Sequence, residues 1–438
     1  MANETYTLIQ KTTLNASAAS ITFSSIPQTF TDLKIVVSAR DVSVTYSSLY
    51  IAINGTAVTS LRKLIGNGTT VTSGTDYIGL IDGTASTASV FGNADIYIPN
   101  YTSSNYKSLS IDMVSENNAT GAHQALAAAI SPATTAISTL AFTCDGSFEK
   151  YTSISLYGVA KEGVTPASSP KATGGDIITN DGTYWIHQFL NSGTFTPSST
   201  LNCDYLVVAG GGGGGGTGGG SSKSGAGGGA GGLRSTVTAT GGGGSLESAL
   251  SVTAQAYAVT VGAGGAISTS GSNSIFSTIT STGGGRGGFT DGSTKYAGLA
   301  GGSGGGGCGG FGIGGPVGAG TNNQGFGGVT GGISFSGTGG GAGATGGTGS
   351  GNIGAEGGAG VATSITGTSV TRAGGGGGGG ISGGGAGGTG GGGAGGGGSA
   401  GSAGTVNTGG GGGGSATTGA GDPGGAGGSG IVIIRYLM

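Results

Sequence analysis

The stretch that decides the fold is residues 204–216, DYLVVAGGGGGGG, in which an apolar segment runs directly into seven consecutive glycines. The chain ends on a matching apolar segment, IVIIRY, at residues 431–436. Short apolar runs with β-branched residues favour strands. The two runs bracket most of the glycine, because residues 1–204 hold only 15 of the 113 glycines. We therefore expect the two runs to pair, so that a sheet closes the glycine-rich region at both ends.

Two known structures of glycine-rich chains are excluded by the residues between these runs. Collagen requires glycine at every third position and abundant proline, but only Pro316 and Pro423 lie beyond residue 204. A calcium-loaded β-roll requires aspartate at fixed offsets between the glycines. Asp291 and Asp422 are the only aspartates beyond residue 204, so this structure is excluded as well.

Two interpretations of the glycine runs remain, of which the longest are residues 210–216 and 374–380. One is a flexible linker, the usual behaviour of glycine- and serine-rich segments. The other is a bundle of polyglycine helices with three residues per turn, in which main-chain groups bond to neighbouring tracts. Each such bond contributes about 0.5–1.5 kcal/mol net. Recurring β-branched segments and the apolar closing strand favour the bundle.

The first 160 residues have the pattern of short β-strands. Apolar and other side chains alternate over residues 33–37 and 49–53, and Asn54-Gly55 is a hairpin signal. Residues 122–130 are either a short helix or a strand at a sheet edge. Similar alternating runs lie at residues 96–98, 109–113, 137–142 and 154–157. Their spacing predicts an antiparallel β-sandwich or jelly roll.

The predicted fold class is therefore all-β plus polyglycine II. Residues 161–175, KEGVTPASSPKATGG, have the prolines and small polar residues of a linker. The predicted domains are a sandwich at 1–160, this linker, and a glycine-rich domain at 176–438, divided into a β-rich part at 176–282, a polyglycine helix bundle at 283–430 and a closing strand at 431–438.

Composition narrows the function. Charged residues make up 8% of the chain and the formal net charge is −3, whereas nucleic-acid binding requires a basic patch. The N-terminus lacks the pattern of a signal peptide, and the apolar runs are far shorter than the roughly 20 residues of a membrane span. Three widely spaced cysteines, Cys144, Cys203 and Cys308, indicate free thiols. We expect no nucleic-acid partner and no membrane insertion.

The sequence shows no recognisable catalytic motif. His187 lies in a strand-like run and is expected to be structural or exposed rather than a catalytic base; His123 is the other histidine. The glycine-rich segments lack the strand–helix context of a dinucleotide site, and no P-loop occurs. We predict no enzyme, no catalytic residue, no cofactor and no metal site. A pair of carboxylates among scattered acidic residues would be the basis of a glycosidase.

Side chains that interrupt the later glycine runs are the candidate binding residues. Aromatic and amide groups on loops suit the recognition of sugars or proteins. The alternative is that the aromatic rings cap the edges of a domain with little other core. The candidates are Arg286, Phe289, Asp291, Lys295, Tyr296, Phe311, Asn322, Asn323, Gln324, Phe326 and Phe335.

Several segments together resemble the glycine-rich domain of phage tail-fibre and adhesin proteins, over about residues 176–438. They are DYLVVAGGGGGGG (204–216), YAVTVGAGG (257–265), NSIFSTITSTGGGRGG (273–288) and GGSGIVIIRY (427–436). The N-terminal part resembles a β-sandwich of structural proteins of marine phages. The segments that carry this second resemblance are FSSIPQTFTDLKIVVSAR (23–40), IYIPNYTSSNYKS (96–108) and SLYGVA (155–160).

The resemblance implies a virion protein that is made in the host cytoplasm. In such adhesins, loops between packed polyglycine helices contact a bacterial surface receptor. The implied partners are other virion proteins, a host glycan or outer-membrane protein, and two further copies in a homotrimer. The N-terminal sandwich would attach the chain to the particle or trimerise. A capsid-bound fibre or decoration protein and a polysaccharide depolymerase are the alternatives.

Overall fold

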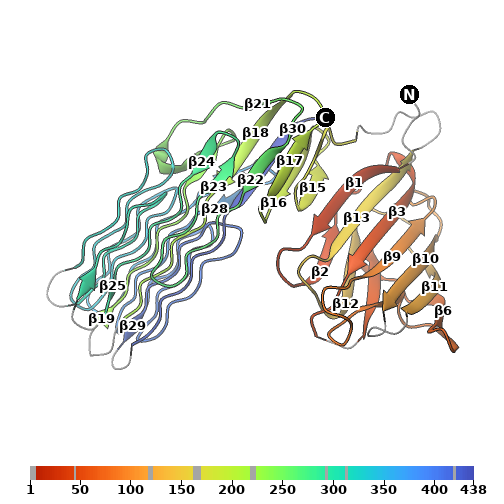
Figure 1. The fold of residues 1–438 in the computed structure, drawn as a ribbon, viewed down its shortest axis with the longest axis horizontal. Helices are drawn as coiled ribbons and strands as arrows, with labels where there is room; N and C mark the ends of the chain where they lie inside the picture. The colour runs from red at the N-terminus through yellow and green to blue at the C-terminus, as the bar shows by residue number, and fades with distance from the viewer. Residues whose placement is uncertain are drawn as a thin grey trace. The chain divides into compact units, whose positions relative to one another are not determined.

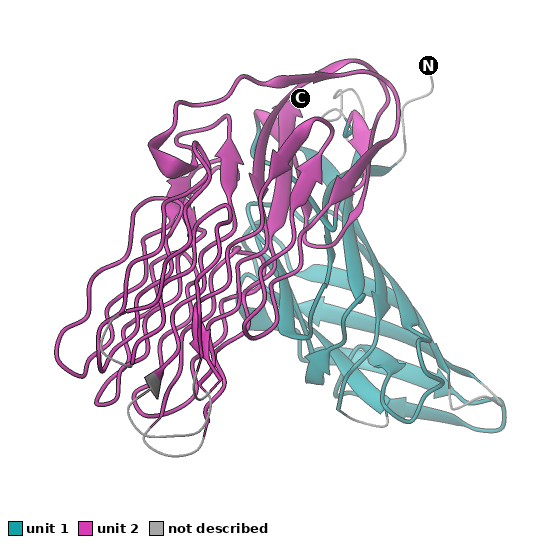
Figure 2. Cartoon of the chain, turned by 60° about the vertical axis from the view of Figure 1, so that its left-hand side comes forward, with its two compact units in different colours: residues 1–170, 176–182, 438 teal, residues 171–175, 183–437 magenta. Residues whose placement is uncertain are grey.

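The chain divides into two compact units in the computed structural model, which describes residues 6–43, 46–116, 122–160, 169–217, 223–291, 294–310, 314–417 and 421–438. One unit comprises residues 1–170, 176–182 and 438, and the other comprises residues 171–175 and 183–437 (Figure 2). The described residues form antiparallel strands and one 3₁₀ turn, with no α-helix among them, which confirms the predicted all-β class. No helix in these ranges is long and apolar enough to cross a membrane.

The first unit is a sandwich of two antiparallel sheets (Figure 1). Its core lies between them and includes Leu33, Ile35 and Val37 from one sheet and Phe142 from the other, all fully buried. The larger sheet has the order β15 (Ile177–Asn180), β1 (Tyr6–Thr13), β13 (Ser153–Ala160), β3 (Phe30–Ala39), β9 (Gly92–Ile98), β10 (Lys107–Glu116), β11 (Ala122–Ser131), β6 (Ser60–Gly66) and β7 (Val71–Gly74). The smaller has the order β2 (Ala18–Phe23), β12 (Leu140–Phe148), β4 (Tyr46–Ile53) and β5 (Thr56–Ala57), and β8 (Gly79–Asp82) also pairs with β4.

The predicted hairpin at Asn54-Gly55 is confirmed. Both residues have positive φ, 49° and 79°, as a two-residue turn of type I′ requires. The strands on either side pair through Ile53 and Thr56. The side chain of Asn54 also accepts hydrogen bonds from the backbone of Ser138 and Thr139, which ties the turn to the neighbouring chain.

Residues 122–130, which the sequence predicted as either a short helix or a strand at a sheet edge, belong to strand β11. β11 pairs with β10 along its whole length and with β6 on its other side, so it lies inside the sheet rather than at its edge. Ala125, Ala127 and Ala129 are buried while the residues between them are exposed, a period of two that a helix does not give. The helix alternative for residues 122–130 is therefore wrong.

The predicted linker at residues 161–175 extends too far. Residues 161–168 lie outside the described ranges, but β14 (Ala172–Thr173) pairs with β17 (Gly193–Pro197) in the second unit. Gly174 and Gly175 follow with φ of 102° and 100°, which only glycine adopts without strain. These residues are thus an ordered turn of the second unit.

One end of the second unit is closed by the sheet that the two apolar runs predicted. Its order is β20 (Leu233–Ser235), β18 (Leu201–Val208), β30 (Ile431–Leu437) and β16 (Tyr184–Phe189). β18 and β30 pair from Asp204 opposite Arg435 to Val208 opposite Ile431, which confirms the prediction. β21 (Leu250–Val252) also pairs with β18, and β22 (Tyr257–Thr260), β23 (Ser274–Phe276) and β24 (Ile279–Ser281) follow β17 in a second small sheet.

The glycine tracts beyond this sheet bond to one another with a period of three residues. Along the tract 209–216, successive N–H groups donate to three different neighbours, and every third N–H returns to the same neighbour. The donor–acceptor pairs are Gly212–Gly229 and Gly215–Ala226, Gly211–Gly428 and Gly214–Gly425, and Gly210–Ser272 and Gly213–Thr269, all with N···O distances of 2.8–3.0 Å. This is the pattern of a helix with three residues per turn and no internal bonds.

The carbonyl groups of the same tract bind three further neighbours. Here the numbers of donor and acceptor rise together, so these neighbours run parallel to the tract, whereas the neighbours that accept its N–H groups run antiparallel. The pairs are Gly284–Gly210 and Gly287–Gly213, Gly265–Gly211 and Ser268–Gly214, and Gly412–Gly212 and Ser415–Gly215. The tract is therefore surrounded by six others, and its main-chain N–H and C=O groups are hydrogen-bonded on all sides.

Close packing explains why these positions are glycine. A Cβ added to Gly211 would lie 2.1 Å from the carbonyl oxygen of Gly410, and one added to Gly214 would lie 2.0 Å from that of Gly413. The bundle also begins at residue 209, and not at 283 as predicted. The β-branched residues between 233 and 282 form short strands at one end of tracts that already belong to the bundle.

Candidate functional site

The glycine bundle has two ends with different side chains. We call the end with β18 and β30 the sheet end, and the opposite end, with β19 (Lys223–Ser224), β25 (Phe289–Thr290), β26 (Lys295–Tyr296) and β29 (Ala416–Thr417), the distal end (Figure 1). Successive described tracts run in opposite directions, so the turns between them alternate between the two ends.

Five of the predicted binding residues come together at the distal end. The rings of Phe289 and Tyr296 stack with centroids 4.4 Å apart and planes 12° apart. The guanidinium of Arg286 lies 4.8 Å from the centroid of Phe289. The hydroxyl of Tyr296 donates to Asp291 at 3.0 Å, and this hydrogen bond raises the pKa of Tyr296. Lys295 precedes Tyr296 in β26.

Phe335 lies at the same end, separated from this cluster by the stretch of chain that contains Cys308 and Gly310. The thiol of Cys308 contacts the carbonyl of Tyr296 at 3.8 Å. Two residues after Cys308, the N–H of Gly310 donates to the carbonyl of Gly332 at 3.1 Å. This hydrogen bond joins the stretch that contains Cys308 to the turn that carries Phe335. Phe311 lies outside the described residues.

The other four predicted residues lie at the sheet end, so the candidates do not share one surface. Asn322, Asn323 and Gln324 form a turn that lines a pocket of about 570 Å³ with Arg234 and Glu247. The side-chain oxygen of Gln324 accepts the N–H of Thr282 at 2.8 Å. The ring of Phe326 lies beside Gly243 at this end. Because each tract runs the length of the bundle, inserts that are close in sequence are separated by that length.

Sequence reasoning missed the isoleucines of the distal turns. Ile333 and Ile353 are 62% and 55% exposed, and Ile267 is 45% exposed. Ile381 lies in the same group of turns, because its N–H donates to Ser334. The sequence offers no signal that distinguishes them, because Ile365 interrupts the glycine-rich sequence in the same way and lies at the sheet end.

His187 is structural, as expected. It is fully buried in β16, its Nδ1 donates to the carbonyl of Gly174 at 2.6 Å, and its Nε2 accepts the hydroxyl of Tyr436 at 3.0 Å. Burial lowers the pKa of His187 to about 4, and the bond to Gly174 opposes this shift. The ring also packs edge-on against Phe195. A histidine without solvent access and with both nitrogens bonded is a core group.

The three cysteines are free and buried. Burial raises the pKa of the Cys144 and Cys203 thiols to about 12, and it raises the pKa of Cys308 as well. These thiols are therefore protonated and unreactive at neutral pH. Across the described ranges, no three His, Cys, Asp or Glu side chains gather closely enough to hold a metal ion.

Comparison with known proteins assigns the second unit. A search of the curated proteins found no match to this chain. A family model described as a glycine-rich domain matches residues 190–437, which is more than half of the chain. The matched residues include the tracts 209–216 and 374–380 and the closing strand β30. The protein therefore belongs to the glycine-rich domain family.

Proposed function

We propose that this chain is an adhesive structural protein of a tailed-phage virion, a tail-fibre or receptor-binding protein that contacts the host surface through the distal end of its glycine bundle. The observation that carries the proposal is the group of exposed apolar and aromatic side chains at that end. Tyr296, Ile333 and Ile353 are exposed there, and the half-buried Phe289 stacks on Tyr296, in a domain whose interior is almost entirely glycine.

The bundle suits this role because it holds its turns rigidly. Binding residues act best when a scaffold fixes them, since less conformational entropy is then lost on association. Each distal turn is anchored by tracts that are bonded on several sides. The turns can vary in sequence, whereas the tract positions must remain glycine because a Cβ would clash there. The binding residues can therefore change without disturbing the packed tracts.

The chemistry of the distal end fits a protein or glycan on a cell surface. Apolar and aromatic side chains that gather on one exposed surface are typical of interaction sites, and Arg286, Asp291 and Lys295 supply charged groups at the same end. We propose that the N-terminal sandwich attaches the chain to other virion proteins and that the assembly is a homotrimer. The distal end would act by binding, without a catalytic step.

Replacing Tyr296 by alanine is expected to weaken binding of the purified full-length protein to host bacteria by about tenfold. The change removes the exposed half of the stacked pair, and central aromatic residues of an interface typically contribute 1–2 kcal/mol or more. Ile333→Ser is expected to act in the same direction. Binding is measured by flow cytometry with labelled protein, over a series of concentrations.

The matched control is Leu246→Ser at the sheet end, which also removes a half-exposed apolar side chain and should leave binding unchanged. If the sheet-end variant loses binding and the distal variants do not, the proposed surface is wrong. Antibody labelling of particles in the electron microscope tests the location. Label on a tail or fibre tip is expected, and label on the capsid surface would instead support a decoration protein.

A further inference from the structure

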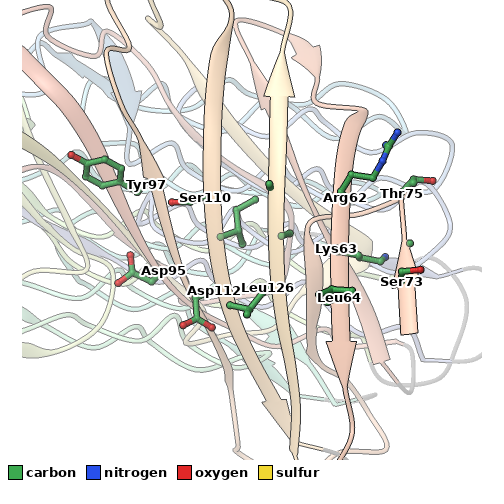
Figure 3. A pocket seen from close by; sticks show the side chains of 14 residues that line it. Arg62, Lys63, Leu64, Ser73, Thr75, Asp95, Tyr97, Ser110, Asp112 and Leu126 are labelled. Carbon is green, nitrogen blue, oxygen red and sulfur yellow. The ribbon is translucent and has the colours of Figure 1, made fainter. Parts of the chain in front are cut away.

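The N-terminal sandwich carries a groove that the proposed function does not use. It lies on the outer face of the larger sheet, across β9, β10, β11, β6 and β7, and has a volume of about 1090 Å³ (Figure 3). Side chains point outward from alternate positions of these strands, away from the sandwich core.

The size of the outward side chains creates the groove. One row across the sheet runs from Tyr97 to Ser110, Ala128 and Arg62, which are opposite one another in successive strand pairs. The two middle side chains are small and the two outer ones are large, so the row is low in the centre and raised at its ends. Three inter-strand spacings give a width of about 14 Å.

The next row brings two carboxylates together. Asp95 and Asp112 lie directly opposite each other on β9 and β10, an arrangement of like charges that destabilises a sheet. Lys34 forms an ion pair with Asp95 at 2.8 Å. Among the described residues, Asp112 receives only a long contact of 3.5 Å from Gln124. A bound group that donates hydrogen bonds to Asp112 would relieve this repulsion.

The same row continues with apolar side chains, and a basic group stands beside it. Leu126 and Leu64 face each other on β11 and β6 and are 53% and 54% exposed. The Arg62 guanidinium donates to the carbonyl of Leu61 at 2.8 Å, and its remaining N–H groups form no ion pair among the described residues. The groove thus offers strong acceptors on one side, donors on the other and an apolar strip between them.

The backbone of the groove floor decides which ligand fits. β10 and β11 are paired on both sides, so their N–H and C=O groups are already bonded within the sheet. An extended peptide on this face would leave its own main-chain groups without backbone partners, which is costly. A saccharide carries hydroxyl groups that both donate and accept, and its ring faces are apolar.

We propose that this groove binds an oligosaccharide. Its hydroxyl groups would donate to Asp112 and Asp95 and accept from Arg62, while an apolar ring face lies on Leu64 and Leu126. The inference does not depend on the role of the distal end, because the two surfaces belong to different units of the chain.

The test uses the labelled full-length protein on an array of neutral and acidic bacterial oligosaccharides, followed by titration with the oligosaccharide retained most strongly. Ser110→Trp fills the low centre of the groove and is expected to weaken binding at least tenfold. Ser108→Trp is the matched control, because Ser108 is also exposed on the same face of β10 but does not line the groove. The control should bind within twofold of the original protein.

Two further variants make the outcome unambiguous. Asp112→Asn keeps the shape of the side chain and should weaken binding several-fold through the lost charge, while Leu246→Ser, which removes a half-exposed side chain of the second unit, should have no effect. Retention of no oligosaccharide, or equal binding by Ser110→Trp and the original protein, would overturn the proposal. Loss of glycan binding in Tyr296→Ala alone would move the glycan to the distal end and equally overturn it.

Discussion

Replacing Gly214 by alanine is expected to lower the free energy of unfolding of the glycine-rich unit by roughly 3 kcal/mol or more. The new methyl carbon would lie 2.0 Å from the carbonyl oxygen of Gly413. Overpacking of this kind costs about 1–3 kcal/mol, and each main-chain hydrogen bond that breaks as the tracts separate adds about 0.5–1.5 kcal/mol. The strain cannot be relieved locally, because the tract is bonded on all sides.

Trp185 makes this measurement specific to the second unit. It is the single tryptophan of the chain, and it is fully buried in β16. Its fluorescence during denaturant unfolding therefore follows the glycine-rich unit. Gly383→Ala is the control, since the nearest atoms to its added Cβ are those of Ile353 at 3.8–3.9 Å. Equal unfolding midpoints for the Gly214 and Gly383 variants would contradict the packed arrangement.

Lowering the pH from 7 to 4 is expected to destabilise the same unit by about 3 kcal/mol through His187. The unfolded imidazole takes up a proton near pH 6.5, whereas burial keeps the folded pKa at about 4. Between pH 6.5 and pH 4 the unfolded chain binds more protons than the folded chain, so the unfolded population grows as the pH falls. The contribution is fully present above pH 6.5 and lost by about pH 4, at about 1.4 kcal/mol per pH unit.

The His187→Gln variant separates this effect from the titration of carboxyl groups. Its side chain does not titrate, so its stability should change less between pH 6.5 and 5 than that of the original protein, although it is less stable throughout. The measurement is denaturant unfolding at several pH values, followed by Trp185 fluorescence. Parallel pH profiles for the two proteins would show that His187 is not responsible.

Much of the fold could be predicted from the alternation and composition of short segments of the sequence. The alternation in residues 33–37 predicted a strand of the sandwich, and the pairing of the run at 204–208 with that at 431–436 followed from their composition. Residues 122–130 remained ambiguous because alanine is a good helix former and lacks the β-branched side chain that favours strands. Burial of every second residue, which is a tertiary property, decided in favour of a strand.

The candidate site was harder to predict, for a geometric reason. Phe326 and Phe335 are separated by few residues, yet they lie at opposite ends of the bundle, because the chain reverses direction at every turn. Ile333 and Ile353 were missed since single apolar residues in a glycine-rich sequence show no period of their own. The direction of each tract, which neither composition nor spacing reveals, determines which residues share a surface.

The most direct test of the central claim is hydrogen exchange at the amides of residues 210–215, followed by mass spectrometry on the intact protein. Main-chain bonds to several neighbouring tracts should slow this exchange by orders of magnitude, to the rate set by unfolding of the whole unit. Exchange of these amides as fast as in an unstructured glycine peptide would contradict the bundle, and with it the rigid distal surface.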